Sequence, residues 1–201
     1  MTPAPVVART SSPAATRALA AALAGVLEPG DLVLLVGELG TGKTTFVQGL
    51  ARGLGVTEPV TSPTFTLVRA YATAGATTAP TAAAGAGGAT AALRTLYHAD
   101  LYRLERLSDV VDLGLGEMAE DEAVAVVEWG DVGRPVFGPD ALTVHLRAEA
   151  AEEQRTLRLV TDGTWSARRA RLAERLRPWS DGAPAGPPGR GEPPPAGGRP
   201  S

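Results

Sequence analysis

The feature that most constrains the fold is a glycine-containing segment between a short apolar run and a helical stretch. Residues 37–44 read G-E-L-G-T-G-K-T, a full match to the pattern G-x-x-x-x-G-K-[ST]. The apolar run at 32–36 is typical of a strand covered on both faces. Residues 43–54 have apolar side chains at helical spacing, with Gly55 as a stop. This order predicts a phosphate site, because loop amides and a helix N-terminus both attract anions.

The residue types in this segment suit a nucleotide and its metal. Lys43 is expected to bring its charge to the β- and γ-phosphates, and Thr44 to offer its hydroxyl to Mg²⁺. Of the 19 basic residues, Lys43 is the single lysine, which indicates a task that a planar guanidinium cannot do. With no second lysine the chain has no Asn-Lys-x-Asp segment to read guanine, so ATP is favoured over GTP. The predicted nucleotide-binding residues of the loop are Glu38, Leu39, Gly40, Thr41, Gly42, Lys43, Thr44 and Thr45.

A phosphate loop of this kind also needs an acidic partner for the metal. The run Ala123–Val127 predicts a buried strand that ends on Glu128. Sheets of this class bind ligands at the carboxyl ends of their strands. Thr44 and Glu128 are therefore the predicted metal ligands, and the acids at 117–122 are weaker candidates because they precede the strand.

The remaining patterns predict a three-layer α/β fold, with a mostly parallel sheet, helices on both faces and an antiparallel extension over 140–161. Further helices are expected at 14–27 and 164–178, and a short helical or irregular acidic segment at 108–122. Further strands are expected at 64–71, 95–101, 142–146 and 157–160, the last two as a hairpin. Arginines cover much of 164–178, which favours a solvated face and leaves an RNA-contacting patch as the alternative.

Three segments are predicted to lie outside a core domain spanning 14–179. Residues 1–13 are short and polar, and a flexible N-terminus is expected. Residues 72–92 are all Ala, Thr, Gly or Pro, too poor in apolar side chains to offset their ordering entropy, which predicts an inserted loop. Residues 180–201 are rich in Pro and Gly and are expected to be a disordered tail.

Composition excludes several classes. The formal charge of −3 argues against a uniformly basic nucleic-acid-binding surface. Without cysteine there is no disulfide framework or thiolate metal site, and two histidines cannot form a His-rich one. The N-terminus lacks the pattern of a secretory signal, and no apolar run approaches the length of a membrane span. A cytoplasmic protein without membrane contact is expected.

Four segments of the sequence, taken in order, form a combined pattern: the loop 37–45 followed by Phe46, the segment S-P-T-F-T-L-V at 62–68, the segment H-A-D-L-Y-R at 98–103 and the pair Glu128-Trp129. Together they resemble the bacterial TsaE (YjeE) family. The loop alone is common to many families, whereas the other segments together are highly specific. The resemblance runs from about residue 10 to about residue 165.

The resemblance implies a role in making threonylcarbamoyladenosine, the modified base beside the anticodon of tRNAs that read codons starting with A. Family members are small ATPases that join TsaD, the transferase subunit, and its companion TsaB. ATP binding and hydrolysis support repeated turnover of that complex. Contact with tRNA is expected to be indirect, if there is any.

The resemblance also carries residue roles. It implies Lys43 on phosphate as a catalytic residue, and Thr44 and Glu128 on Mg²⁺. Thr16 resembles a contact near the nucleotide base, and Asp100 looks like a second catalytic acid that orients the attacking water or holds a metal-bound one. Trp129 would lie beside the nucleotide.

Strand patterns also predict the surroundings of Asp100 and of the two histidines. Strand alternation predicts His98, Asp100 and Tyr102 on one face, where His98 and Tyr102 have a structural reading as good as a functional one. His145 is predicted to be structural.

Two other functions fit the loop. A small-molecule or nucleoside kinase shares it, but such enzymes usually carry an Arg-rich lid, and residues 70–130 contain only Arg94, Arg103 and Arg106. A non-catalytic ATP-dependent switch is the third reading, and Asp100 and Glu128 argue mildly against it. The linked motifs favour the ATPase.

Overall fold

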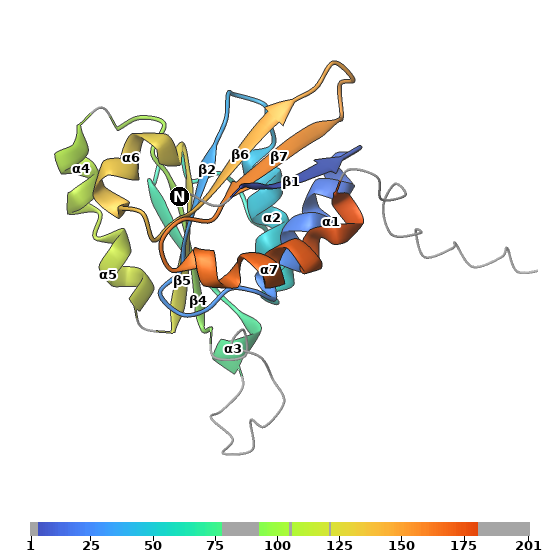
Figure 1. Ribbon diagram of the computed structural model, residues 1–201. Helices are drawn as coiled ribbons and strands as arrows, with labels where there is room; N and C mark the ends of the chain where they lie inside the picture. Colours follow the sequence, from blue (N-terminus) through green and yellow to red (C-terminus); the bar gives the residue numbers. More distant parts are fainter. Residues whose placement is uncertain (1–3, 78–92, 105, 121, 181–201) are drawn as a thin grey trace, which may run out of the picture.

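The computed structural model describes residues 4–77, 93–104, 106–120 and 122–180 (Figure 1). Strands and helices alternate through most of the chain, as an α/β protein requires. In chain order the elements are β1 (Val6–Thr10), α1 (Pro13–Ala24), β2 (Leu32–Val36), α2 (Lys43–Gly53), β3 (Val68–Ala72), α3 (Ala74–Thr77), β4 (Thr95–Asp100), α4 (Leu107–Asp112), α5 (Leu115–Glu120), β5 (Ala123–Glu128), α6 (Gly130–Phe137), β6 (Leu142–Ala148), β7 (Arg155–Val160), α7 (Trp165–Leu176) and the 3₁₀ turn η2 (Arg177–Trp179).

The strands form a single sheet in the order β1-β7-β6-β2-β5-β4-β3. Strands β6, β2, β5 and β4 pair in parallel and make its centre. Every residue of β5 is buried, as expected for a parallel strand covered on both faces. Antiparallel strands complete both edges: β7 and β1 beyond β6, and β3 beyond β4. The expected mostly parallel sheet with an antiparallel extension is confirmed, and its other edge is antiparallel as well.

Helices cover both faces of the sheet and enclose two cores (Figure 1). Helices α1, α2 and α7 lie on one face, where the larger core gathers alternate residues of the strands such as Val33 and Leu35. Helices α4, α5 and α6 lie on the other face, over Leu34 and Val127. Alternate residues of β2 thus point into opposite cores, which explains why its sequence is apolar without a break.

Two local expectations were wrong, and one helix was not anticipated. The N-terminal segment is not wholly flexible, because Val6–Thr10 form β1, which pairs with β7 and buries Val6 and Ala8. The strand expected from residue 64 starts at Val68, because the preceding residues turn back with the amides of Thr66 and Leu67 on the carbonyl of Pro63. Helix α6 was not predicted, since Pro135 lies inside it.

The predicted insertion joins two neighbouring strands. Ala72 and Thr95 are register partners at the start of the β3–β4 ladder, and Thr73 N–H continues the pairing to the carbonyl of Arg94. Within 72–92, residue 72 belongs to β3 and Ala74–Thr77 form α3. The expectation of a flexible loop otherwise falls on 78–92, and that of a disordered tail on 181–201, both outside the described residues.

Among the described helices, none combines the length and apolarity that crossing a membrane would demand.

Candidate functional site

The loop between β2 and α2 presents its backbone at the carboxyl end of the central strands. Gly42, which caps α2, has φ of 96°, a left-handed conformation that glycine adopts without strain. The hydroxyl and the amide of Thr41 both bond to the carbonyl of Glu38, which closes the loop on itself. The amides at the start of α2 therefore face the loop, an arrangement that suits an anion.

Lys43 is held over this loop by three groups. Its Nζ donates to the carbonyls of Gly37 at 2.7 Å and Glu38 at 2.9 Å, and lies 3.8 Å from the ring centroid of Trp129. The side chain is 5% exposed. Burial lowers the pKa of Lys43 below its ordinary value, and the charge of Glu128 acts in the opposite direction.

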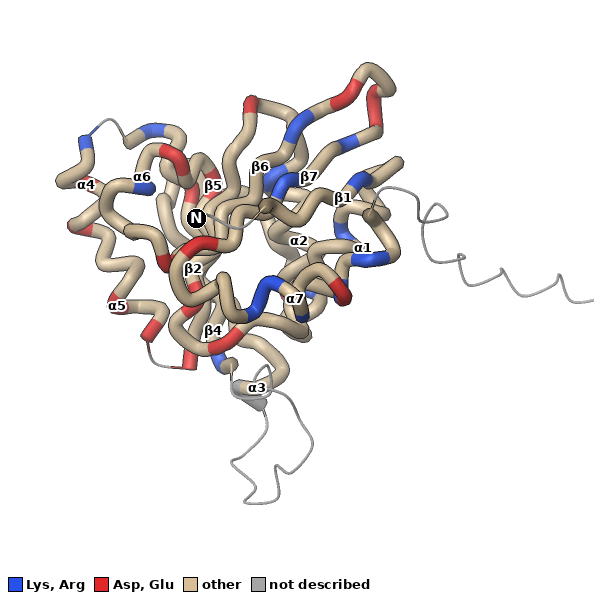
Figure 2. The backbone as a smooth tube through the Cα atoms, in the orientation of Figure 1, with Lys and Arg blue, Asp and Glu red and all other residues tan. Residues whose placement is uncertain are grey.

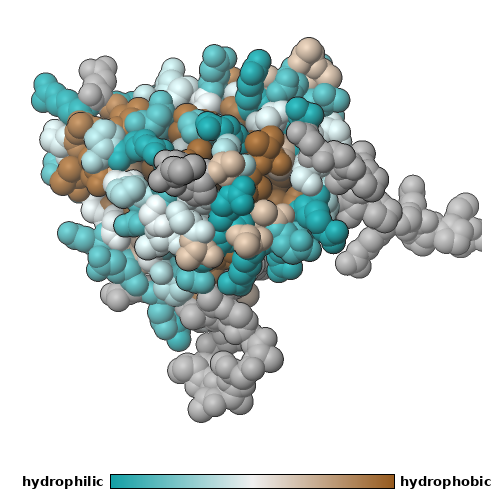
Figure 3. Space-filling view, in the orientation of Figure 1, coloured by the Kyte–Doolittle hydropathy of each residue, from teal (hydrophilic) through white to brown (hydrophobic). Residues whose placement is uncertain are grey.

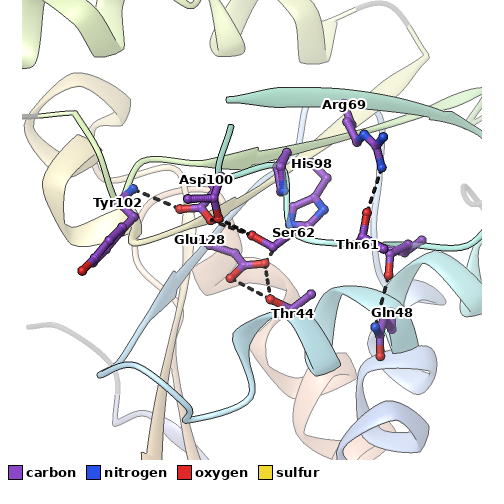
Figure 4. Close-up of polar contacts among 12 residues, drawn as sticks. Thr44, Gln48, Thr61, Ser62, Arg69, His98, Asp100, Tyr102 and Glu128 are labelled. Carbon is purple, nitrogen blue, oxygen red and sulfur yellow. Dashed lines mark hydrogen bonds and ion pairs between the residues drawn. The ribbon is translucent and has the colours of Figure 1, made fainter. Parts of the chain in front are cut away.

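Thr44 and Glu128 face each other across the site (Figure 4). The Thr44 hydroxyl lies 2.8 Å from Oε1 and 3.1 Å from Oε2 of Glu128. On the far side of the carboxylate, Nε2 of the fully buried His98 lies 2.9 Å from Oε1. His98 and Thr44 together fix the orientation of the carboxylate.

Asp100 lies beside Glu128, because the two are register partners at the ends of β4 and β5. Its carboxylate accepts hydrogen bonds from the hydroxyls of Ser62 at 2.8 Å and Thr64 at 2.7 Å, and from the amide of Tyr102 at 3.0 Å (Figure 4). Ser62 and Thr64 were missed as site residues by the sequence reasoning. Their signal was two hydroxyls in the segment that precedes β3, a segment used only for the resemblance.

The expected grouping of three side chains on one strand face is only partly right. His98 and Asp100 point to the α2 side of β4, but β4 ends at Asp100 and Tyr102 lies in the following turn. The Tyr102 ring packs instead on Trp129, with ring centroids 5.0 Å apart. Trp129 has φ of 57° directly after β5, and this turns its ring toward Lys43. Trp129 thus lies beside Lys43, and its expected position beside a nucleotide stays a prediction.

A small pocket of about 80 Å³ opens beside the loop. Thr16 lines it together with Gly40, Gly42 and Thr45, and the Thr16 hydroxyl lies 2.8 Å from that of Thr10. The remaining lining residues are Pro13, Thr41, Glu153 and Arg155. The structure therefore places Thr16 next to the loop, although it is 27 residues from Lys43 in the sequence.

Arg155, at the start of β7, contacts the loop and was not anticipated. Its guanidinium donates to the carbonyl of Thr41 at 3.0 Å and of Gly40 at 3.3 Å. These bonds tie the β6–β7 hairpin to the tip of the loop, where the predicted residue Leu39 is 82% exposed. The contact spans 114 residues, so no local pattern predicts it.

The second histidine lies away from this site. His145 is half-buried on β6, next to Arg158 of β7 in register. Burial, with the positive charges of Arg158 and Arg134, lowers its pKa, and Asp131 opposes them. No contact joins it to the loop or to the two acids within the part of the chain that the structure describes.

Fold and loop together define the class of protein. It is an α/β protein in which a glycine-containing loop connects a central parallel strand to a helix, with an acid at the end of each of two neighbouring strands. Comparison with known proteins then identifies the family. Residues 10–157 match the family model described as threonylcarbamoyl adenosine biosynthesis protein TsaE. The chain belongs to the TsaE family.

Individual relatives agree. The tRNA threonylcarbamoyladenosine biosynthesis protein TsaE of Bacillus subtilis is 35% identical over 146 residues, which cover 73% of this chain and 80% of the relative. The protein of the same name from Streptomyces coelicolor is 37% identical over 146 residues, 72% of this chain and 87% of the relative. The crystal structure of Bacillus YdiB superimposes with a TM-score of 0.63 at 31% identity, covering 88% of this chain and 96% of that one.

Proposed function

We propose that this chain binds ATP at the loop 37–45 and hydrolyses it. The observation that carries the proposal is the convergence of Lys43, Thr44 and Glu128 at one point, from a helix start and a strand end that are distant in the sequence. Lys43 faces the phosphates as a compact charge, and the loop amides bind their oxygens. Trp129, which lies beside Lys43, and Thr16, which lines the pocket next to the loop, would be further contacts of the nucleotide.

Mg²⁺ fits the facing oxygens of Thr44 and Glu128. Magnesium favours oxygen ligands and is usually held by one or two protein groups together with phosphate oxygens and water. The described residues contain no cluster of three or more His, Cys, Asp or Glu that could hold a metal by themselves. The direct bond of 2.8 Å between Thr44 and Glu128 brings together the two oxygens that would share the ion. When bound, the ion neutralises charge on the phosphates.

Asp100 is the proposed second catalytic acid, which orients the attacking water. Its carboxylate is positioned by the hydroxyls of Ser62 and Thr64, at the strand end adjacent to Glu128. Hydrolysis needs a water in line with the bond to be broken, so an acid that cannot rotate helps to place it.

Membership of the family supports a place in threonylcarbamoyladenosine synthesis, as the names of the relatives state for those proteins. We infer that the chain is the cytoplasmic ATPase subunit that acts with TsaD and TsaB, and that ATP turnover serves repeated cycles of that complex. Exposed apolar side chains around the loop support a partner-dependent site: Leu39 is 82%, Phe65 85% and Tyr102 56% exposed.

The test is ATP turnover by the purified chain, alone and with the TsaB–TsaD pair from the same organism. A slow basal rate that changes when the pair is added is expected. Unchanged turnover with a folded pair would remove the partner role. Absence of ATP binding by calorimetry would remove the nucleotide site itself.

A further inference from the structure

The outer half of the sheet has a second face that the nucleotide site does not use. Leu157 and Leu159 of β7 point into the larger core against α7, so Thr156 and Arg158 point to the opposite side. Register places His145 beside Arg158, and Arg147 beside Thr156. We call the face formed by Arg9, His145, Arg147, Thr156 and Arg158 the arginine face.

Three exposed arginines from three strands converge on the arginine face. Arg147 and Arg9 are the register partners of Thr156 on its two sides, which separates them by two strand spacings, about 10 Å. Arg158 lies two residues along β7 from Thr156. Figure 2 shows the basic positions on β1, β6 and β7 as neighbouring blue segments. The chain as a whole is acidic, with a formal charge of −3, so this concentration is local.

Two of the arginines on this face are not bonded to other described parts of the protein. Within the described residues, Arg147 and Arg158 have neither an ion pair nor a side-chain hydrogen bond. By contrast, Arg168 is paired with Asp31, and Arg171 donates to the carbonyl of Gly25. The alternative of an RNA patch on α7 thus fits less well, because Arg168, Arg169 and Arg171 are all bonded to other parts of the protein.

Other charged groups around the face leave a positive field. Arg158 and Arg134 both lower the pKa of His145, after burial, and their effect opposes that of Asp131 on α6. Asp162 is paired with Arg134 at 3.5 Å. The remaining acids, Glu149, Glu152 and Glu153, lie at the hairpin turn beyond the end of β6. Figure 3 shows hydrophilic side chains over the upper part of this region.

We propose that the arginine face binds the phosphate backbone of a structured RNA. Guanidinium groups pair with phosphate oxygens through two parallel hydrogen bonds, and the exposed Arg147 and Arg158 are available for this. The face carries no Phe, Tyr or Trp, and the imidazole of His145 is half-buried, so the recognition would rest on the phosphate backbone and its shape and not on the base sequence. RNA binding here does not require ATP, and the proposal stands apart from nucleotide hydrolysis.

The test measures binding of a labelled, unmodified tRNA transcript to the full chain by fluorescence anisotropy over a series of KCl concentrations. The variant is Arg147→Glu/Arg158→Glu. The matched control is Arg52→Glu/Arg177→Glu, which changes the net charge equally at exposed positions outside the face. Circular dichroism and ATP binding establish that each variant is folded. Lys43→Ala is included, because loss of ATP binding there with RNA binding intact separates the two sites.

The affinity for tRNA is expected to fall at least about tenfold in the face variant, Arg147→Glu/Arg158→Glu. In the control Arg52→Glu/Arg177→Glu it should fall less than about threefold. The slope of log Kd against log salt should fall by roughly 1.5 in the face variant, since each phosphate contact contributes about 0.7–0.9. Equal losses in both variants, or no tRNA binding by the wild-type chain, would overturn the proposal. Binding of poly-glutamate in place of tRNA would overturn it too, and would assign the face to an acidic protein.

Discussion

At the scale of single residues, Lys43 is held by three neighbouring groups. Its ammonium fits between the carbonyls of Gly37 and Glu38 and the ring of Trp129, a space matched to a compact charge. Lys43→Ala should lower ATP affinity at least about 100-fold, equivalent to about 2.7 kcal/mol. Lys43→Arg should lose nearly as much, because a planar fork cannot occupy this space. Calorimetric titration with MgATP measures both, and wild-type affinity in either variant would contradict the assignment.

The hydrogen bonds that Asp100 accepts from Ser62 and Thr64 allow ATP binding and ATP turnover to be tested separately. Ser62 and Thr64 hold the carboxylate, and in the described residues Asp100 has no hydrogen bond or ion pair with the loop 37–45, although its charge acts on Lys43. Asp100→Asn should therefore reduce ATP turnover at least about 100-fold, a barrier change of about 2.7 kcal/mol, and leave the Kd for ATP within about threefold. Ser62→Ala/Thr64→Val should reproduce part of the turnover loss. A parallel fall in affinity and turnover would show that Asp100 acts on binding instead.

At the scale of elements, the packing of α1 against α2 fixes the position of the helix that begins at the end of the phosphate loop. Gly49 of α2 lies against the backbone of Arg17, whose Cα would be 2.6 Å from an added Cβ. Gly49→Ala should destabilise the fold by about 1–3 kcal/mol, because backbone must move to admit the methyl group. Thermal unfolding followed by circular dichroism measures the effect.

The chain offers a matched control for that substitution. Gly116 lies in α5, where nothing occupies the space of an added Cβ. Gly116→Ala should be neutral or stabilise by up to about 1 kcal/mol, through helix propensity and a less flexible unfolded chain. If both substitutions lower the melting temperature equally, close packing between α1 and α2 is not the cause.

At the scale of the whole molecule, α7 is tied to the central sheet by the pair of Arg168 and Asp31. The guanidinium donates to both carboxylate oxygens, at 2.7 and 2.5 Å, and Asp31 is 7% exposed. Burial raises the pKa of Asp31, and the bond from Arg168 partly offsets this. Arg168→Ala should cost about 3–5 kcal/mol at neutral pH, because it leaves a buried carboxylate unpaired.

The pH dependence of that loss follows from the sign of the shift. A carboxyl whose pKa is higher in the folded than in the unfolded state contributes stability at low pH, and this is lost as the pH rises through the folded pKa. Without Arg168 the pKa of Asp31 rises further, so the loss of stability should be smaller at pH 4.5 than at pH 7.5. Urea unfolding of wild type and variant at both values measures it, and a pH-independent difference would contradict the explanation.

Sequence patterns predicted the centre of the molecule better than its edges. Strand β2, the loop, α2 and the strand ending at Glu128 each carry a local signal, either a continuous apolar run or a motif. Strand β1 carries little, because its stability comes from pairing with β7 at the far end of the chain. The same holds within the site. The bond from Arg155 to the loop and the bonds from Ser62 and Thr64 to Asp100 join residues that are distant in the sequence, so the spacing of a motif does not reveal them.

The pairing of Ala72 with Thr95 has a practical consequence for studying the molecule. The end of β3 and the start of β4 are therefore neighbours. Asp100 lies at the opposite end of β4, about 17 Å away along the strand. A fluorophore or an affinity tag attached at Ala72 would therefore be anchored far from the proposed nucleotide site. The antiparallel pairing of β3 with β4 would keep the two strands in register, because lengthening the loop between them adds little to the entropic cost of closing it.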